Sequence, residues 1–457
     1  MSILTHKHSH ILENVSMFHG FGILELLMKN DKKNIFILFG ATGDLAREKI
    51  LPALFSICTK KIIENLTIIA VSRRNWTSSD YRDFVLKEAK LPILQRAQRT
   101  VKDQKNLDDF LSSIMYVAGD IQQGVYVYQT IKDYINTQKT KRVVAYFSVA
   151  PHFFQAMVTD GAKAGLWGEH QKVRVLLEKP YADNERSFSA LIKTINDTIG
   201  KHALLVDHYL GKDVMQAIQK IRVPNKALET KIKSKLKHIV IRLFENNVAD
   251  RRGEFYDKLG AFIDVGANHE LQMLASLVAP LRGPKIQSEK LFASLSVNKQ
   301  HVVPMQYQGY QKTDQVHKDS KTETAFEITL SSTLSYLKDV PIILAGGKGF
   351  SSYQSDMVAV FEDGSHITVT LKPREGIHAT YPKIIENYPK PQEAYETIVE
   401  QAFQEKTSIF VTPEEAKHEW RIITDVKKAF AQKNIETYNK GAQVPEYDTT
   451  NPIWDML

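Results

Sequence analysis

The short segment VDHYLGKD, residues 206–213, places Asp207, His208, Tyr209 and Lys212 within a few positions of one another. If the segment begins a helix, His208 and Lys212 are four residues apart and lie on one face. Free amide N–H groups point outward at a helix start, so a cationic pair there favours the binding of an anion such as phosphate. The alternative is a polar helix start with a solvated lysine, and these eight residues alone leave both interpretations open.

A second candidate lies in the segment IFILFGATGDLAREKI, residues 35–50, which reads as a strand, a tight glycine turn and a helix start. Gly40 and Gly43 are separated by two residues, so the segment departs from the full G-x-G-x-x-G fingerprint. Small residues still allow the backbone to approach a pyrophosphate, and the following helix offers its amides. An ordinary strand-to-helix turn is the alternative. The candidate cofactor-binding residues of the turn are Gly40, Ala41, Thr42, Gly43, Asp44 and Leu45.

The end of the next apolar run bears on which cofactor would bind. NAD-selective sites place an acid there for the ribose hydroxyls, whereas an arginine suits a 2′-phosphate. This chain reads IIAVSRRNW, with Arg73 and Arg74 and no acid. The pattern favours NADP over NAD, with Arg73 as the candidate contact, although two arginines also occur on ordinary surfaces.

Six apolar runs alternate with helical patterns from residue 35 onward. They are rich in β-branched and aromatic residues and lack strict alternation, which is typical of strands buried on both faces of a parallel sheet. We therefore expect a doubly wound, Rossmann-like α/β domain over residues 31–206. The runs are IFILFG (35–40), LTIIAVS (66–72), IMYVAG (114–119), RVVAYFSVA (142–150), VRVLLEKP (173–180) and HALLVDH (202–208).

Later segments alternate between apolar and polar residues and predict a large, mainly antiparallel sheet in an α+β domain over residues 207–457. Two of them are separated by a glycine-containing turn, as in a hairpin. Residues 1–30 read as a mobile N-terminal extension. The alternating segments are HIVIRLFEN (238–246), TAFEITLSS (324–332), MVAVFEDG (357–364) and HITVTLKP (366–373), and helical patterns lie near 265–280 and 391–404.

The composition limits the protein's class. The 457 residues carry a net charge of +8, but basic residues are interleaved with acidic ones, so we expect no nucleic-acid binding. Cys58 is the single cysteine, so no intrachain disulfide forms. No apolar run is long enough to span a membrane, and no signal-peptide pattern precedes residue 31. The chain reads as a cytoplasmic protein without a membrane span, and we expect no metal site.

Several motifs, taken in order, resemble the signatures of the glucose-6-phosphate dehydrogenase family. Any one of them is weak, whereas the ordered set is specific, and the resemblance runs from about residue 34 to about residue 430. The motifs are GATGDLA, LLEKPYA, DHYLGKD, DRRGEFYDKLGAFIDVGANHELQML, DVPIILAGGKG, LKPREGI and PQEAYETIVEQAFQEKTSIF.

The resemblance implies NADP-dependent oxidation of glucose 6-phosphate at C1 to a lactone, in an oxidative pentose phosphate route. His269, in GANHEL, matches the family's general base, and Asp207 matches the carboxylate that orients it. A histidine suits this role because its pKa lies near working pH. Asp264 and His269 are five apart, so on an α-helix they would not share a face.

Further positions match the family's ligand contacts. His208, Tyr209 and Lys212 match the group that holds the substrate phosphate, which decides between the two readings of VDHYLGKD. Lys179 is expected near both substrate and cofactor, and the following Pro180 resembles a cis-proline of the family. The residues that match sugar contacts are Glu245, Asp264 and Lys348.

The chain departs from the family pattern close to the pocket. Tyr353 stands five positions after Lys348, where a cation is expected, and a charged hydrogen bond contributes about 1.5–3 kcal/mol. Sugar preference is therefore open. The other departures are Leu205, Tyr181, Ala182, Ile263 and Ala267.

Two other functions compete with the leading one. A divergent paralogue would oxidise another sugar or sugar phosphate, and a non-catalytic regulator would bind NADP without turnover. NAD remains a possible second cofactor. Family members are usually dimers or tetramers, so we expect a homodimer or homotetramer.

Overall fold

The computed structural model describes residues 32–91, 100–167, 173–249, 253–283, 285–380, 382–388 and 392–446. The predicted N-terminal extension lies outside these residues. The chain forms two compact units. The first unit comprises the described residues within 1–149, 156–175 and 198–202, and the second comprises those within 150–155, 176–197 and 203–457.

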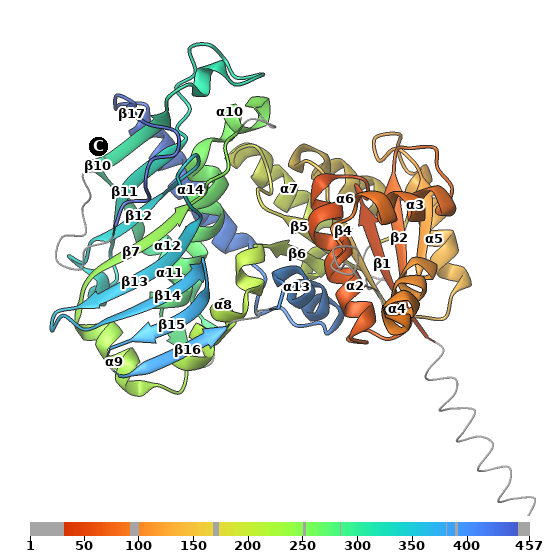
Figure 1. Ribbon diagram of the computed structural model, residues 1–457, viewed down its shortest axis with the longest axis horizontal. Helices are drawn as coiled ribbons and strands as arrows, with labels where there is room; N and C mark the ends of the chain where they lie inside the picture. The colour runs from red at the N-terminus through yellow and green to blue at the C-terminus, as the bar shows by residue number, and fades with distance from the viewer. Residues whose placement is uncertain are drawn as a thin grey trace, which may run out of the picture. The chain divides into compact units, whose positions relative to one another are not determined.

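All six apolar runs form strands, and they belong to one sheet in the order β3-β2-β1-β4-β5-β6 (Figure 1). The pairings of β1 with β2 and β4, and of β2 with β3, are parallel. The strand order reverses at β1 and β4, and in such sheets ligands bind beyond the carboxyl ends of the strands at this point. The predicted doubly wound sheet is confirmed. Its strands are β1 (Lys33–Phe39), β2 (Leu66–Ser72), β3 (Ile114–Ala118), β4 (Thr140–Phe147), β5 (Val173–Glu178) and β6 (Ala203–Val206).

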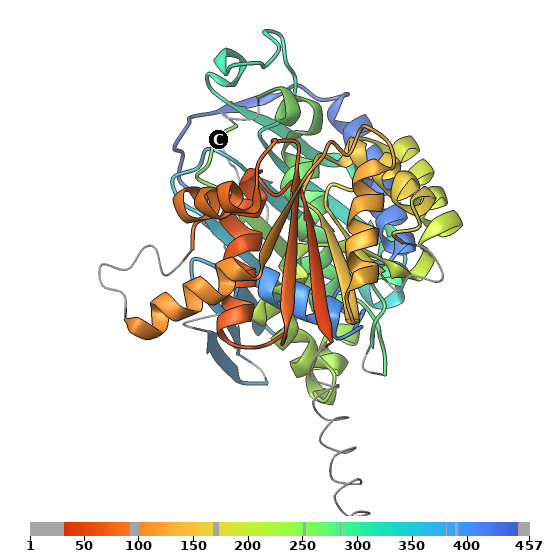
Figure 2. The ribbon, with the colours of Figure 1, turned by 90° about the vertical axis from the view of Figure 1, so that its right-hand side faces the viewer.

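Helices lie on both faces of β1 to β4 (Figure 2), which explains why β1 is buried along nearly its whole length. Two of the helices begin with reciprocal capping boxes, Thr77 with Asp80 and Thr100 with Asp103, which satisfy free backbone amides of the first turn. The helices of this unit are η1 (Ala46–Ile50), α2 (Leu51–Thr59), α3 (Ser78–Glu88), α4 (Val101–Ser112), α5 (Tyr126–Thr137) and α6 (Phe154–Lys163).

The second unit contains a nine-stranded mixed sheet in the order β16-β15-β14-β13-β7-β12-β11-β10-β17 (Figure 1). Only the pairs β7–β12 and β10–β17 are parallel, so the predicted, mainly antiparallel sheet is confirmed. The predicted hairpin is β13–β14, whose turn contains Gly364 at φ +78°. The strands are β7 (Leu236–Phe244), β10 (Leu295–Tyr307), β11 (Ala325–Ser332), β12 (Ile342–Gly347), β13 (Gln354–Phe361), β14 (His366–Lys372), β15 (Glu375–Ala379), β16 (Ile384–Tyr388) and β17 (Glu436–Tyr438), with β8 (Leu281–Arg282) and β9 (Lys285–Ile286) pairing separately.

A π-helix, η6 (Phe262–Glu270), contacts the central strands β7 and β12 of this sheet. It continues directly into α11 (Leu271–Val278), so the predicted helix near 265–280 has two geometries. Short π segments often occur at functional sites. The remaining helices are α7 (Glu185–Thr198), α8 (Asp213–Arg222), α9 (Lys226–Ser234), α10 (Gly253–Ala261), α12 (Ser288–Ser294), α13 (Ala394–Phe403) and α14 (Pro413–Phe430), with short turns η3 (Pro151–Phe153), η4 (Gly200–His202), η5 (His208–Gly211), η7 (Tyr310–Lys312) and η8 (Ser335–Leu337).

None of the helices in the described part of the chain combines the length and the apolar character that a membrane crossing requires.

Candidate active site

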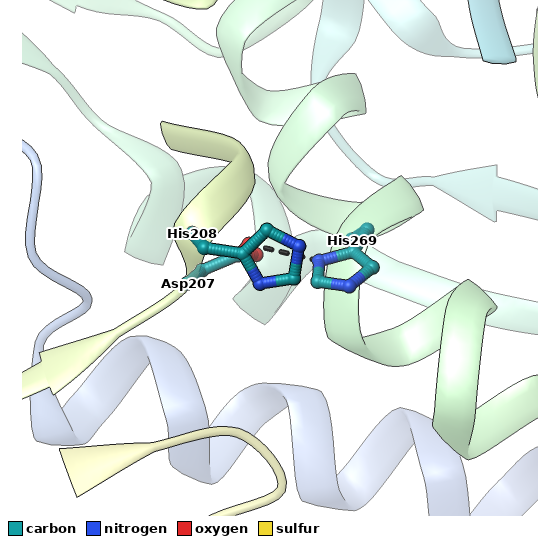
Figure 3. Close-up of side chains that lie close together, drawn as sticks. All are labelled: Asp207, His208 and His269. Atoms are coloured by element: carbon teal, nitrogen blue, oxygen red, sulfur yellow. Dashed lines mark hydrogen bonds and ion pairs between the residues drawn. The ribbon is translucent and has the colours of Figure 1, made fainter. Parts of the chain in front are cut away.

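An aspartate and a histidine form a buried pair in the second unit (Figure 3). Asp207 directly follows β6, and His269 is the penultimate residue of η6. The His269 Nδ1 atom lies 2.9 Å from Asp207 Oδ1, and the backbone N–H of Tyr209 donates to the same oxygen at 3.0 Å. The sequence-predicted partners therefore meet across 62 residues of chain.

The surroundings favour an ionised aspartate. Burial opposes the charge of Asp207, but the neighbouring His269 and Lys179 outweigh it and lower the carboxyl pKa to about 2. An ionised carboxylate only accepts hydrogen bonds, so His269 donates to it from Nδ1–H and Nε2 carries the lone pair. Burial lowers the pKa of His269, and Asp207 opposes this shift. The neutral histidine is thus prepared to accept a proton at Nε2.

Two aromatic rings hold the imidazole of His269. The ring of Tyr209 stacks on it, with centroids 4.1 Å apart and planes 18° apart. The ring of His208 approaches edge-on at 4.6 Å. Within the described residues, Nε2 of His269 contacts no hydrogen-bond partner. The ring is therefore fixed in orientation while its second nitrogen stays available.

The ligand atoms of Asp207, His208 and His269 all lie within 4.8 Å of one another, a spacing that a metal ion could use (Figure 3). Asp207 already accepts hydrogen bonds from His269 and from Tyr209 N–H. We therefore treat these side chains as a hydrogen-bonded group and not as metal ligands.

A buried lysine extends this pair. Lys179 follows β5 as Asp207 follows β6, and the Lys179 N–H donates to the Val206 carbonyl at 3.2 Å. Its ammonium lies 3.5 Å from Asp207 Oδ2 and donates to the Asn268 carbonyl at 3.1 Å. The predicted cis bond between Lys179 and Pro180 is confirmed. The structure therefore places Lys179 beside the histidine–aspartate pair, while its contacts with substrate and cofactor stay a prediction.

The three predicted sugar contacts also lie together. Glu245 follows β7 and Lys348 follows β12, and because these strands are parallel neighbours with Phe244 opposite Gly347, the two side chains emerge side by side. Lys348 pairs with Glu245 and, at 2.8 Å, with Asp264 of η6. Burial disfavours the lysine charge, but the two carboxylates outweigh it and raise the Lys348 pKa. The cluster presents both hydrogen-bond acceptors and donors, as a polyhydroxylated ligand requires.

The expectation that Asp264 and His269 point to different sides rested on α-helical geometry, and that premise is wrong. Both residues belong to the π-helix η6, in which each N–H bonds to the carbonyl five residues earlier. Residues five apart are therefore stacked one turn above the other. The two residues therefore lie closer to one face of the helix than an α-helix would place them.

The segment VDHYLGKD does not form one helix, so the expectation of His208 and Lys212 on a shared helical face is wrong. Residues His208–Gly211 form the 3₁₀ turn η5, which Asp207 caps, and α8 begins at Asp213. Lys212 lies between them with extended backbone, φ −70° and ψ 142°. The Asp207 side chain accepts from the Tyr209 N–H and so caps this tight turn, and the extended Lys212 separates the turn from α8.

The candidate phosphate residues have partners of their own. His208 Nδ1 lies 3.2 Å from Glu178 Oε1, and Lys212 Nζ lies 3.0 Å from Glu375 Oε1. The Tyr209 hydroxyl lies 2.8 Å from that of Tyr353, the residue that replaces an expected cation. His208 and Lys212 thus lie close to carboxylates that a bound anion would have to displace or share.

The glycine turn of the first unit has the features of a phosphate-binding loop. Gly40 has φ +74°, and a Cβ atom there would lie 2.1 Å from the Ser148 carbonyl oxygen. The Gly40 and Ala41 N–H groups both donate to Val71, and Gly43 N–H donates to Gly40. The turn therefore sits at the carboxyl ends of β1, β2 and β4, where only glycine fits at position 40.

A cavity of about 670 Å³ opens beside this turn. The Arg74 guanidinium stacks over Trp76, 4.6 Å from the ring centroid, and among the described residues it forms no ion pair. A flat cation on an aromatic ring suits a nucleotide base or a phosphate. The predicted contact Arg73 is exposed and does not line the cavity. The lining residues are Thr42, Asp44, Arg47, Arg74, Trp76, Asp80, Asp83, Phe84, Lys87 and Glu88.

Sequence reasoning missed four side chains of the second unit. Glu419 pairs with Lys179, Gln272 bonds to Glu419, Glu375 pairs with Lys212, and Tyr395 donates to Glu178. For Glu419 a signal existed, because this carboxylate lies on the apolar face of α14, three residues after Ala416 and three before Ile422. The other three carry no local signal.

Both parts of the chain match one family. Residues 37–217 match the family described as "Glucose-6-phosphate dehydrogenase, NAD binding domain", and residues 219–378 and 373–451 match "Glucose-6-phosphate dehydrogenase, C-terminal domain".

Curated relatives cover most of the chain. Glucose-6-phosphate 1-dehydrogenase of Helicobacter pylori is 28% identical over 88% of this chain and 95% of its own length. The enzyme of the same name from Borreliella burgdorferi is 26% identical over 90% of this chain and 95% of its own length.

Solved structures share the fold. The structure described as "Glucose-6-phosphate dehydrogenase in complex with its substrate glucose-6-phosphate" has a TM-score of 0.80 at 22% identity, covering 91% of this chain and 96% of that one. Glucose-6-phosphate 1-dehydrogenase from Mycobacterium avium has a TM-score of 0.78 at 23% identity, covering 90% and 95%.

Proposed function

Because the chain belongs to the glucose-6-phosphate dehydrogenase family, and is thus an oxidoreductase with a nicotinamide-binding domain, we propose that it oxidises glucose 6-phosphate at C1 to 6-phosphogluconolactone with NADP. The observation that carries the proposal is the buried His269–Asp207 pair, whose Nε2 atom has no partner among the described residues. The reaction would open an oxidative pentose phosphate route.

Proton removal is the task of His269. Its Nε2 takes the proton of the C1 hydroxyl as the C1–H bond breaks and its electron pair leaves as hydride. Bound nicotinamide supplies the hydride acceptor. Asp207 keeps Nδ1 protonated, so that Nε2 is the basic atom, and its negative charge stabilises the imidazolium that forms. The ammonium of Lys179 lies beside Asp207, and its positive charge is proposed to act on the substrate oxygen through the local field.

The sugar is held by two groups of side chains in this proposal. Glu245, Asp264 and Lys348 hydrogen-bond the hydroxyls, supported by their mutual ion pairs. The substrate phosphate is taken by the three residues around η5, namely His208, Tyr209 and Lys212. Binding would require the phosphate to share Lys212 with Glu375.

The cofactor phosphates are held by the turn from Gly40 to Leu45, whose geometry would admit a pyrophosphate. Arg73 is the proposed contact of the 2′-phosphate, and Lys179 is proposed to contact the nicotinamide end. The Arg74–Trp76 stack would support the adenine. The absence of an acid after β2 favours NADP, with NAD as a possible alternative.

One observation favours a second candidate, a paralogue for another sugar or sugar phosphate. Tyr353 occupies the position of an expected cation and bonds to Tyr209, and Lys212 already pairs with Glu375. Fewer unpaired positive charges would weaken selection for a phosphorylated sugar.

The test measures formation of reduced nicotinamide with glucose 6-phosphate, glucose and other hexose phosphates, each with NADP and NAD. We expect the highest kcat/KM with glucose 6-phosphate and NADP, and a loss of about 10²–10⁴-fold in His269→Asn. A higher kcat/KM with another sugar would establish the paralogue. Cofactor binding without turnover of any sugar would leave the non-catalytic regulator.

A further inference from the structure

Glu419 is a buried carboxylate that the proposed mechanism does not use. It lies on α14, whose start is set by the Thr412–Glu415 capping box, and only 3% of its surface is exposed. Its Oε1 atom accepts from Lys179 Nζ at 2.8 Å and from Gln272 Nε2 at 2.9 Å. A carboxylate is retained in such a place only where partners compensate the cost of burial, so its effect must pass through Lys179 or Gln272.

The ammonium of Lys179 is shared unequally between two acids. An ammonium has three N–H donors, and those of Lys179 face Glu419, the Asn268 carbonyl and Asp207 at 2.8, 3.1 and 3.5 Å. The shortest contact goes to Glu419 and the longest to Asp207. Glu419 therefore draws the cation away from the carboxylate that orients His269.

The charges along this chain of contacts alternate. Glu419 is negative, Lys179 positive and Asp207 negative, and Asp207 bonds in turn to His269 Nδ1. Without Glu419, the full positive charge of Lys179 would act on Asp207 and His269 in a site of low dielectric, where such effects are strong.

We propose that Glu419 is a positioning residue for the reaction, which acts through Lys179 to leave Asp207 free to orient His269 and to stabilise its protonated form. This inference rests on the proposed role of His269 as the base. Glu419 itself touches neither substrate nor cofactor in this assignment, so its removal should alter how readily His269 takes a proton.

Other charged groups face the same cluster and bear on its titration. Glu178 and His208 lie beside Asp207 on the side of β5 and η5, and they pair with each other. Glu415 lies one turn before Glu419 on α14, and burial raises its pKa to about 7. Burial also raises the pKa of Glu419, an effect that Lys179 opposes. The proposal concerns pH values at which the Lys179–Glu419 pair is ionised.

The experiment compares wild type with Glu419→Gln, which keeps the shape and removes the charge. The His269 pKa is measured by NMR titration of the free protein, with the signal assigned by its loss in His269→Asn. We expect the His269 pKa to fall by about one unit in Glu419→Gln, because an uncompensated cation disfavours the imidazolium. The acidic limb of kcat/KM should move to lower pH with it, and kcat should fall by about tenfold with little change in KM.

The control is Arg421→Gln on the same helix. Arg421 donates to the carbonyls of Phe292 and Leu295 at 2.8 and 2.9 Å, away from Lys179. It should lower thermal stability without moving the His269 pKa. Glu419→Asp, which keeps the charge, should bring the pKa back toward the wild-type value. The same limb is compared between variants with one substrate, since a substrate phosphate itself titrates near pH 6.

Equal His269 pKa values in wild type and Glu419→Gln would overturn the inference and leave Glu419 a structural residue. If the pH profile of kcat/KM is the same in His269→Asn as in the wild type, the proposed function itself is overturned. If Glu419→Gln does not fold, the double variant Lys179→Met/Glu419→Leu takes its place in the experiment, because it leaves neither charge of the pair buried. Its His269 pKa should equal or exceed that of wild type, and a lower value would contradict coupling through Lys179.

Discussion

The glycine turn of the first unit and the histidine–aspartate site of the second are built in different ways. The turn uses six consecutive residues, 40–45, and works mainly through its backbone. The second site uses side chains that follow β5, β6, β7 and β12, together with η6 and α14, and its Lys179–Glu419 pair joins residues 240 apart.

This difference has a physical cause. A phosphate-binding turn needs amides in one conformation, which a few small residues determine locally. Proton transfer needs a base of defined tautomer and charge, and both depend on neighbours that only the fold brings near. Changes in the first region should therefore alter binding through shape, whereas changes in the second should alter titration.

The largest expected effect is in the second region, from Asp207→Asn. An amide cannot stabilise the imidazolium and can donate to Nδ1, which moves the proton to Nε2 and removes the base. We expect kcat to fall by about 10³-fold, with cofactor affinity unchanged, as measured by steady-state kinetics and cofactor titration. A variant with near wild-type kcat would show that the pair is structural.

Gly40→Ala tests the first region by shape alone. The substitution imposes φ +74° on a residue with a side chain and places Cβ 2.1 Å from the Ser148 carbonyl oxygen. We expect cofactor binding to weaken roughly a hundredfold through displacement of the turn. The left-handed backbone conformation of the new alanine should also lower the free energy of unfolding by about 1–2 kcal/mol.

Gly124→Ala is the matched control, because Gly124 has φ +76° but nothing within 4 Å of its added Cβ. It should show the same backbone cost in chemical denaturation and bind the cofactor normally. Equal cofactor affinity in the two variants would contradict the role of the turn.

Arg73→Ala and Arg74→Ala separate charge from stacking in the cofactor region. Removing Arg73 should lower the preference for NADP over NAD by about tenfold, the effect of one charged hydrogen bond. Removing Arg74, which stacks on Trp76, should weaken both cofactors by several-fold and leave the preference unchanged. The measurement is kcat/KM for each cofactor. A reversed pattern would assign the 2′-phosphate to Arg74.

Glu270→Leu concerns stability rather than turnover. Glu270 is fully buried beside His269, and burial raises its pKa well above the usual value, an effect that the backbone N–H of Leu243 opposes only in part. The folded protein keeps the carboxyl proton of Glu270, whereas the unfolded chain loses it above about pH 4.5. The wild type therefore loses stability as the pH rises from about 4.5 toward the raised pKa of Glu270 in the folded protein.

The free energy of unfolding of the wild type, relative to Glu270→Leu, should therefore fall by up to about 1.4 kcal/mol per pH unit across that window. Denaturant titrations at several pH values measure it. The exposed Glu289→Gln on α12 serves as the control and should show no such slope. A difference between wild type and Glu270→Leu that is constant with pH would mean that Glu270 is ionised in the fold.

Much of the architecture follows from the sequence itself. The apolar runs identified all six strands of the first sheet, because burial on both faces requires continuous β-branched and aromatic residues. The β13–β14 hairpin and the tight glycine turn at Gly40 likewise follow from local chemistry. The motifs also paired Asp207 with His269, through resemblance and not through spacing.

Only the tertiary structure decided the geometry and the charge state of the second site. Nine residues are too few for apolar periodicity to distinguish a π-helix from an α-helix. The geometry of η6, which packs against β7 and β12, therefore became known only from the folded backbone. The break at Lys212, between η5 with its Asp207 cap and the start of α8, likewise became known only from the folded chain. The effect of Glu419 on the base could not be predicted from the sequence, because a carboxylate acts on a base only through the distance and burial that folding sets.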